Sequence, residues 1–174
     1  WFTADIAGVK AGARYKFRID DEIDVPDPAS AFQPDDVFGP SEVFDHMAYP
    51  WRTADWRGRP WQEAVVVEAH VGTFTGRGSY RAMIDRLDHL VDTGITALEL
   101  MPLADFAGSR NWGYDGVLWY APDSGYGQPD DLKALIDAAH QRGLMMMLDV
   151  VYNHFGPEGN YLGRYAPSFF TEAH

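Results

Sequence analysis

Three polar residues follow an apolar run near the C-terminal end of the sequence. The run covers residues 144–148, and Asp149, Asn153 and His154 come within the next six positions. The burial of a strand gives no reason for a carboxylate, an amide and an imidazole at this place. Each of them alone is as well explained as a cap on the following loop. Together they indicate a functional site, because ligands of parallel α/β proteins bind at the carboxyl ends of the strands.

A second candidate site is the loop at residues 101–128, which joins the end of another predicted strand to a helix. About two to six residues would be enough for such a connection. A long aromatic loop at this face is a candidate binding loop, because flat rings suit the apolar faces of sugars. The alternative is a loop whose rings bury one another, which we expect for Phe106, Trp119 and Tyr120. The aromatic residues of the loop are Phe106, Trp112, Tyr114, Trp119, Tyr120 and Tyr126.

The elements that must position these residues begin at residue 64. Apolar runs at 64–71, 95–100 and 144–148 predict three buried parallel strands. The spacing of apolar residues predicts one helix over residues 80–91 and another that begins at Pro129. Right-handed crossovers would make the three strands neighbours in one sheet. The first helix has an N-cap, and a glycine follows each helix: Ser79, Gly94 and Gly143.

Two histidines of these elements are expected to have no catalytic role. His70 ends the first strand, where we expect a hydrogen-bonded residue at the top of the sheet. His140 lies on the second helix, on a face that we expect to be in contact with solvent.

The N-terminal part of the sequence has a different pattern. Polar and apolar residues alternate over residues 14–20, which is typical of a strand with one buried face in an antiparallel sandwich. More than half of the 11 prolines of the chain lie in residues 24–60, so this segment reads as an extended connector. We therefore expect the tail of a β-sandwich domain at residues 1–45, a connector at 46–63 and a separate α/β domain at 64–174.

The composition excludes several classes of protein. A net charge of −12 argues against nucleic acid binding, which needs a basic surface, and it suits a neutral substrate. The absence of cysteine excludes disulfides and thiolate metal sites and favours a reducing, cytoplasmic location. No run of 18 apolar residues predicts a membrane span. The sequence begins at Trp1 without a methionine and stops at His174, so we expect a fragment.

Several motifs together resemble the α-amylase superfamily of glycoside hydrolases. They are DVVYNH at residues 149–154, which is similar to a signature region after the third barrel strand, NWGYDG at 111–116 and EAHVGTFT at 68–75. Within the superfamily, the sequence most resembles the malto-oligosyltrehalose trehalohydrolase family. That closer resemblance rests on longer strings: residues 27–30, 33–34, 39–41, 101–104 and 152–162.

The resemblance implies an α/β protein with a (β/α)8 TIM barrel behind a β-sandwich. This chain would supply the tail of the sandwich and the first three barrel strands, since a complete barrel takes about 250 residues. The nucleophilic Asp, the acid/base Glu and a third Asp of the family follow strands four, five and seven. The resemblance therefore places no catalytic residue in this chain. The reaction it implies is retaining hydrolysis of the α-1,4-glucosidic bond next to the trehalose end of maltooligosyl trehalose, without a cofactor or a metal.

The resemblance also implies supporting roles for residues that the chain does contain. Tyr114 would stack under the reacting sugar, and His154 would hydrogen-bond one of its hydroxyl groups. Asp149 would hold an arginine next to the nucleophile. Asn153 ligates calcium in many amylases, but a lone amide is weak evidence for a metal site. Trp112 would either line the cleft or pack against its own loop.

Two other functions remain open at this stage. A glycogen-branching or debranching enzyme shares the Trp-Gly-Tyr loop at residues 112–114 and the Asn-His pair at 153–154. A carbohydrate-binding protein without catalysis would also explain a sandwich remnant and an aromatic loop. In all three readings the partner is an α-glucan, with maltooligosyl trehalose as the leading candidate.

Overall fold

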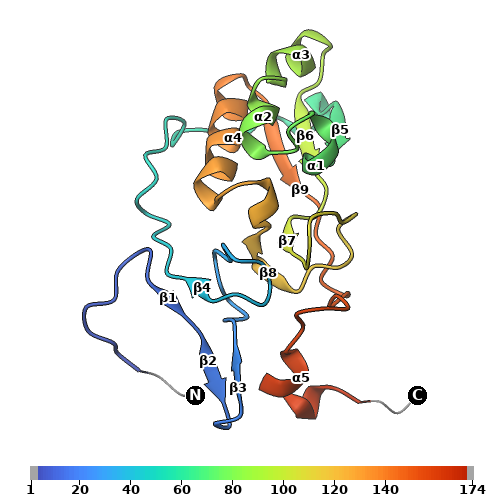
Figure 1. Ribbon diagram of the computed structural model, residues 1–174. Coiled ribbons are helices and arrows are strands. Elements are labelled where there is room, and N and C mark those ends of the chain that lie inside the picture. The colour runs from blue at the N-terminus through green and yellow to red at the C-terminus, as the bar shows by residue number, and fades with distance from the viewer. Residues whose placement is uncertain (1–3, 172–174) are drawn as a thin grey trace.

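A computed structural model describes residues 4–171 of the chain (Figure 1). The terminal residues Trp1 and His174 lie outside the described part. Three parallel strands form the central sheet: β5 (Val66–Ala69), β6 (Ala97–Leu100) and β9 (Met145–Leu148), in the order β5-β6-β9. Helices alternate with these strands along the chain. The predicted order of strand, helix, strand, helix and strand is confirmed.

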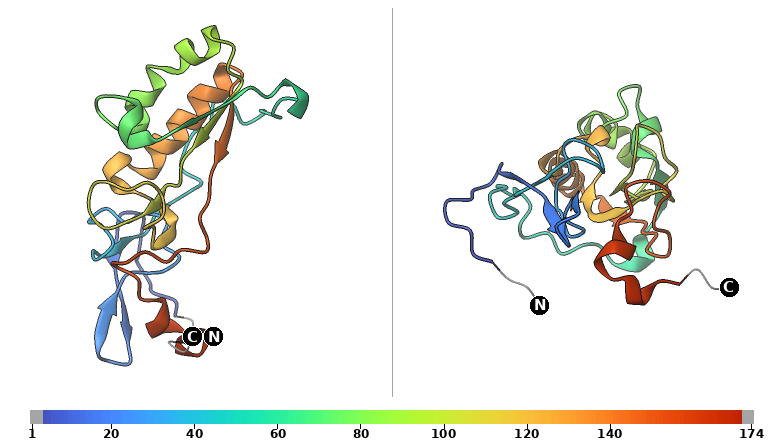
Figure 2. Two further views of the ribbon diagram at one scale, coloured as in Figure 1. Left: turned by 90° about the vertical axis from the view of Figure 1, so that its right-hand side faces the viewer. Right: turned by 60° about the horizontal axis from the view of Figure 1, so that its bottom comes forward.

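The helices cover one face of this sheet (Figure 2, left). They are α1 (Val71–Phe74), α2 (Tyr80–Ile84), α3 (Leu87–Asp92) and α4 (Pro129–Gln141). Fully buried side chains from the helices and the strands form the main core between them, among them Tyr80, Met83, Leu98, Leu135 and Leu144. The burial of this apolar surface is the main force that fixes the strand ends in space.

The predicted helix over residues 80–91 is in fact two helices, α2 and α3. It begins as predicted, since the Ser79 hydroxyl accepts a hydrogen bond from the Ala82 backbone N–H. The Arg86 N–H then bonds to the carbonyl of Met83 at 2.9 Å, which is a tighter turn than an α-helix makes. The bend lets Met83 and Leu87 both stay fully buried on either side of it.

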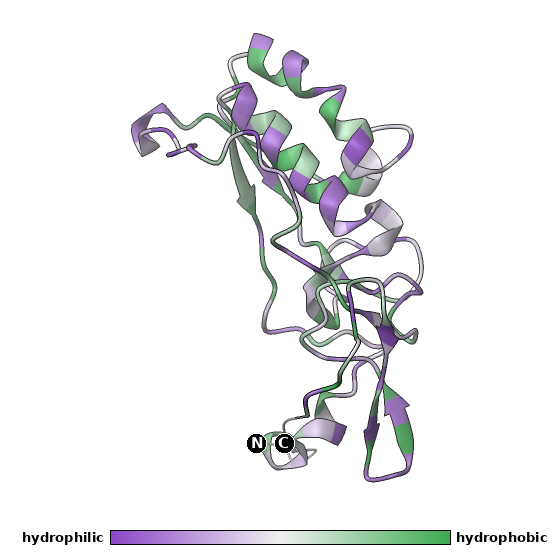
Figure 3. Cartoon of the chain, turned by 90° about the vertical axis from the view of Figure 1, so that its left-hand side faces the viewer, coloured by the Kyte–Doolittle hydropathy of each residue, from purple (hydrophilic) through white to green (hydrophobic). Residues whose placement is uncertain are grey.

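Within residues 4–171, no element covers the other face of the sheet. Val66 on the edge strand β5 is 40% exposed. Met145 and Met147 of β9 point to this bare face as well, because they alternate with Met146, which packs against the core under the helices. Figure 3 shows β9 as an apolar strand with no layer over that side. Glu68 and Glu99 are register partners on β5 and β6. Apolar edges and a bare sheet face are features that other parts of a protein normally cover.

We expect the 174-residue chain alone to bind the dye ANS and to associate as its concentration rises, because the edges β5 and β9 and the bare face are open. Light scattering and ANS fluorescence between about 1 and 100 µM would measure both effects. Val66→Lys, which places a charge on the β5 edge, should reduce the association. A monodisperse monomer that binds no ANS and melts cooperatively would contradict this expectation.

The N-terminal part differs from the predicted single strand. It forms two separate antiparallel ladders, one from β1 (Arg14–Tyr15) and β4 (Ser41–Glu42), the other from β2 (Phe17–Ile19) and β3 (Ile23–Val25). The strand divides because its two halves pair with different partners. The predicted buried face is wrong at Phe17, which is 45% exposed.

The segment between β4 and β5 has one short 3-10 helix, η1 (Trp61–Glu63), and crosses α4 on its outer side. Asp137 of α4 accepts hydrogen bonds from the Arg52 and Thr53 backbone N–H groups and from the Thr53 hydroxyl. Trp56 stacks on His140, with ring centroids 4.8 Å apart. The expectation of a solvent-facing His140 is therefore wrong, and its burial lowers the pKa of its imidazole.

The aromatic loop and the C-terminal part form the remaining elements. The loop contains the hairpin of β7 (Ala104–Asp105) and β8 (Leu118–Pro122), followed by the 3-10 helix η2 (Ser124–Tyr126). After β9 come α5 (Leu162–Tyr165) and the 3-10 helix η3 (Pro167–Phe169). No helix within residues 4–171 has the length and apolar character that crossing a bilayer would require.

Candidate functional site

The end of β9 leads directly into the polar residues singled out in the sequence. The Asp149 N–H donates to the Leu100 carbonyl at 2.9 Å, so the sheet pairing continues one residue beyond β9. The chain then leaves the sheet, and Asn153 and His154 are exposed in the following loop. The sheet therefore fixes where this polar segment starts.

Tyr114 and His154 lie together although they are 40 positions apart in the sequence. Their ring centroids are 5.5 Å apart, with an interplanar angle of 62°. Tyr114 is 54% exposed, and the His154 side chain is exposed as well. A tyrosine face and an imidazole on the same open surface can stack on a sugar ring and hydrogen-bond its hydroxyl groups.

Asn153 orients His154. The Asn153 Oδ1 atom lies 3.0 Å from Nδ1 of His154. Because an amide oxygen accepts, Nδ1 carries the proton, and in the neutral imidazole Nε2 remains an acceptor. Nε2 is thus the atom that can accept a hydrogen bond from a bound hydroxyl group.

Two glycines let the backbone of the Tyr114 loop and of the His154 segment pack closely against neighbouring residues, and these contacts hold both segments in place. Gly113 has φ +109°, and a Cβ there would lie 2.6 Å from the Pro102 ring. Gly156 has φ +56°, and a Cβ there would meet the Asp115 carbonyl at 2.5 Å. Both positions require glycine for its left-handed conformation and for its lack of a side chain. The Asn111 Oδ1 atom also accepts from the Tyr114 N–H, at 3.2 Å.

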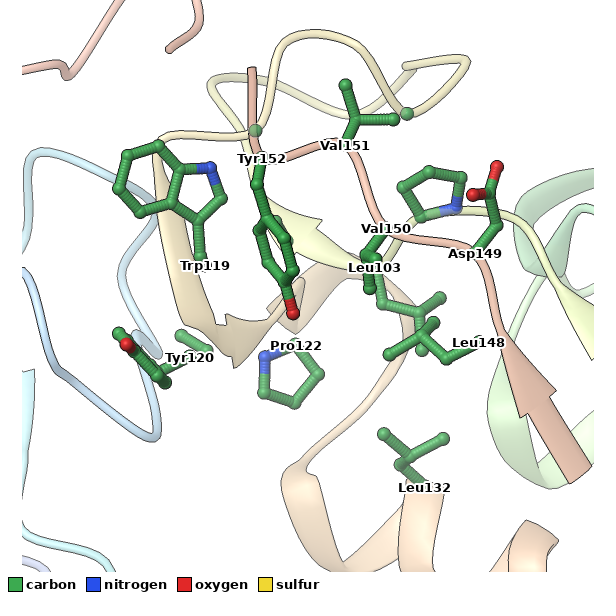
Figure 4. A pocket seen from close by; sticks show the side chains of 15 residues that line it. Leu103, Trp119, Tyr120, Pro122, Leu132, Leu148, Asp149, Val150, Val151 and Tyr152 are labelled. Atoms are coloured by element: carbon green, nitrogen blue, oxygen red, sulfur yellow. The ribbon is translucent and has the colours of Figure 1, made fainter. Parts of the chain in front are cut away.

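An apolar cavity of about 160 Å³ lies between the first residues after β9 and the hairpin of β7 and β8 (Figure 4). Leu132 and Leu148 face into it from one side and the ring of Tyr152 from the other. The carboxylate of Asp149 points away from these apolar side chains. Asp149 lies at the rim of the cavity and has no hydrogen bond or ion pair to its side chain within residues 4–171, so it is available to a charge from elsewhere.

The aromatic residues of the loop divide into packed and exposed rings. Phe106 is buried and Trp119 packs edge-on against Phe155, so the prediction of packed rings is confirmed for these two. The same prediction is wrong for Tyr120 on β8, which is 70% exposed. Trp112 is 78% exposed and so does not pack on its own loop in this structure; its place in a substrate cleft stays a prediction.

Within the described part of the chain, no three His, Asp or Glu side chains gather in a way that could hold a metal ion. The amide oxygen of Asn153 is occupied by His154.

The profile of the α-amylase catalytic domain matches residues 47–168, which is most of the chain. The chain belongs to the α-amylase family. Its TIM-barrel-type fold class is thereby confirmed, with the central sheet as the part of the barrel that the chain contains.

Relatives within the α-amylase family give finer information. The malto-oligosyltrehalose trehalohydrolase of Deinococcus radiodurans is 54% identical over 94% of this chain and 27% of its own length. That of Saccharolobus solfataricus is 43% identical over 97% of this chain and 30% of its own length. A crystal structure described as an alpha amylase of Salmonella typhimurium superposes with a TM-score of 0.94 at 52% identity, covering 100% of this chain and 31% of that protein. The chain spans less than a third of each of these relatives.

Two buried aspartates of this α-amylase family chain could not be recognised from the sequence. Asp105 of β7 and Asp123 after β8 are both buried, at 1% and 2% exposure. Asp123 accepts hydrogen bonds from the Gly125 and Phe106 N–H groups, whereas neither Asp105 oxygen accepts one. Burial, and then the neighbouring Asp123, raise the pKa of Asp105 to about 9, which favours the protonated form of its carboxyl group at neutral pH.

The pair should make stability depend on pH. Burial also raises the pKa of Asp123, to about 6. Both folded-state pKa values lie above 3.8, the ordinary value of an aspartate. The stabilising contribution is therefore complete below about pH 4, and it is lost as the pH rises from there through the folded-state pKa values. Asp105→Asn keeps a donor to Asp123 and cannot ionise.

We therefore expect Asp105→Asn to raise the free energy of unfolding at pH 8 by on the order of 1–3 kcal/mol and to change little at pH 4. Urea unfolding of the dilute chain, followed by tryptophan fluorescence, should show a midpoint about 1 M higher at pH 8. An equal shift at both pH values would mean that the carboxyl pair does not share a proton.

Proposed function

We propose that this chain is the N-terminal part of the catalytic barrel, with the preceding segment, of a malto-oligosyltrehalose trehalohydrolase. The proposed reaction is retaining hydrolysis of the α-1,4-glucosidic bond adjacent to the trehalose end of maltooligosyl trehalose, which releases trehalose. The names of the relatives at 54% and 43% identity support this substrate. The observation that carries the proposal is the contact between Tyr114 and His154 on the open end of the sheet.

The residues of the chain act by binding and orienting the substrate. Tyr114 stacks under the reacting glucose ring, and Nε2 of His154 accepts a hydrogen bond from a hydroxyl of the same ring. Asn153 fixes the His154 tautomer through its amide oxygen. Asp149 holds an arginine of the longer protein next to the nucleophile, and Trp112 lines the substrate cleft.

The two carboxyl groups that break the bond come from later barrel strands in this proposal. Retaining hydrolysis needs a nucleophile and an acid/base about 5 Å apart. No cofactor or metal takes part in the proposed reaction. Holding the sugar with a stacked ring and directed hydrogen bonds lowers the barrier by fixing its position relative to those carboxyl groups.

The proposed domain organisation follows the sequence pattern. We assign residues 1–45 to the tail of a β-sandwich domain, 46–63 to a connector and 64–174 to the first three β/α units of the barrel. The absence of cysteine supports a cytoplasmic location. The net charge of −12 supports a neutral glucan as the partner rather than nucleic acid.

Product analysis tests the proposal directly. The longer protein that contains this chain should be incubated with maltooligosyl trehalose, and the released trehalose measured by chromatography. Free trehalose, together with a maltooligosaccharide shortened at that end, is the expected result. New α-1,6 branches without trehalose would identify a branching enzyme. Loss of α-1,6 branches from glycogen in a parallel incubation, without trehalose release from maltooligosyl trehalose, would identify a debranching enzyme. Binding without any product would identify a non-catalytic carbohydrate-binding protein.

A further inference from the structure

The segment after β9 is held against the N-terminal part of the chain at two places. At one of them α5 lies beside the hairpin of β2 and β3 (Figure 1), where the Tyr165 hydroxyl donates to the Pro26 carbonyl at 2.6 Å and Arg164 pairs with Glu22 at 2.9 Å. The other place is Gly159. Both contacts are made by the segment that carries one half of the candidate site.

Val37 is the N-terminal residue that meets Gly159. Gly159 has φ +79°, and a Cβ there would lie 2.5 Å from Cγ2 of Val37 and 3.3 Å from Cγ2 of Val117. Val37 is fully buried and packs in one cluster with Val117, Leu118 and Ala121 of the aromatic loop. Val37 thus touches both segments that form the candidate site, the aromatic loop and the segment after β9.

The turn that carries Val37 is held in shape by its own hydrogen bonds. The fully buried side chain of Gln33 donates to the Gly39 carbonyl at 2.9 Å. The carboxylate of Asp36 accepts from the Val37 N–H at 2.6 Å and from the Gly108 N–H of the aromatic loop at 3.0 Å. The turn is therefore fixed in itself and tied to the aromatic loop, so Val37 offers a firm support to the segment that lies on it.

His154 lies between two anchors of the chain. Before it, the Asp149 N–H bonds to the sheet, and after it, Gly159 lies against Val37. The His154 side chain between these anchors is exposed, and its ring meets that of Tyr114 at a centroid distance of 5.5 Å. Because an exposed side chain has no surrounding core to orient it, the position of the imidazole follows from where the two anchors hold the backbone.

We propose that Val37 is a positioning residue, which acts through Gly159 to hold His154 against Tyr114 during the reaction. The inference rests on the proposed function, and it gives the N-terminal part a share in the rate of the barrel. Val37 itself is fully buried and acts only through its neighbours. A displacement of a reacting group by about 1 Å can lower a rate by up to about 100-fold, so the loss of this support should be visible in kcat.

The test is a double-mutant cycle in the longer protein, followed by initial rates of trehalose release. Val37→Ala should lower kcat about 5- to 50-fold. In the His154→Ala background the same substitution should cause no further loss, because the group that Val37 positions is absent. Val25→Ala is the matched control: it removes the same two methyl groups from an equally buried valine outside the cluster. It should lower the melting temperature by a similar amount and leave kcat within about twofold of the wild-type value.

Gly159→Ala tests the same contact from the other side and leaves no hole in the core. Its added methyl group overlaps Val37 and pushes the segment away, so kcat should again fall at least about 5-fold, and only while His154 is present. Gly163→Ala is the control, because a Cβ there meets no atom within 4 Å. It should leave kcat unchanged.

Three results would overturn the positioning role of Val37. They are an unchanged kcat in Val37→Ala or Gly159→Ala, a loss in Val25→Ala as large as that in Val37→Ala, and equal losses in the presence and absence of His154, which would mean a merely structural role. If Val37→Ala does not fold, the cycle of Gly159→Ala with His154→Ala decides alone. A longer protein that releases no trehalose from maltooligosyl trehalose would instead refute the proposed function, and the positioning role with it.

Discussion

In the longer enzyme, Tyr114→Ala and His154→Ala should each lower kcat/KM for maltooligosyl trehalose about 30- to 1000-fold. This range corresponds to about 2–4 kcal/mol of lost transition-state stabilisation, the amount expected for a group that acts directly on the reacting sugar. The melting temperature should change little, because Tyr114 is 54% exposed and His154 lies in an exposed loop. Initial rates of trehalose release and thermal melts of both variants measure the two effects.

Phe106→Leu is the control for this prediction. Phe106 is buried at 2% exposure and packs near Tyr126, with ring centroids 6.0 Å apart. Its replacement should lower the melting temperature and leave kcat/KM close to the wild-type value. The opposite pattern for Tyr114→Ala, a lower melting temperature with near-normal kcat/KM, would show that this ring belongs to the loop core.

The 174-residue chain by itself should hydrolyse no α-glucan above the uncatalysed background. Retaining hydrolysis needs two carboxyl groups about 5 Å apart around the bond. Three residues immediately follow the strands of the described sheet: His70, Met101 and Asp149. Only Asp149 carries a carboxylate. Binding groups without the nucleophile and the acid/base give little acceleration, so the expected loss relative to the complete enzyme is many orders of magnitude.

Overnight incubation of the chain with maltooligosyl trehalose, followed by an enzymatic assay for free trehalose, measures this. The longer protein at the same molar concentration is the positive control. Turnover by the chain, abolished by Asp149→Asn, would place the chemistry on β9 and contradict the assignment of both carboxyl groups to later strands.

The strands and helices of the α/β part could be predicted from the sequence, because the apolar runs and the helix-end residues there agree with the packing of the whole sheet. The apolar runs are long enough for buried strands, and the helix signals at Ser79, Gly94, Pro129 and Gly143 lie where the helices begin and end. The strand-end rule then placed Asp149, Asn153 and His154 at the carboxyl end of β9. Resemblance to the family predicted the roles of Tyr114 and His154, and the structure brings their rings into contact.

The parts that the sequence did not predict depend on contacts between distant segments. The alternating pattern around Phe17 does not say which segment will pair with each half of the strand, and two partners divide it. Trp119 and Tyr120 are neighbours on β8 and therefore point to opposite faces, but the sequence does not say which face will be covered; Phe155, a residue from beyond β9, covers the side of Trp119. The raised pKa values of Asp105 and Asp123 are likewise set by burial among segments that the local sequence does not specify.

The contact between Tyr114 and His154 is best tested by a crystal structure of the longer protein with bound maltotetraose. A glucose ring should lie on the face of Tyr114 at about 4 Å, with one of its hydroxyl groups about 2.8 Å from Nε2 of His154. Sugar confined to the apolar cavity between Leu132 and Tyr152, with Tyr114 and His154 in contact with solvent alone, would contradict the account.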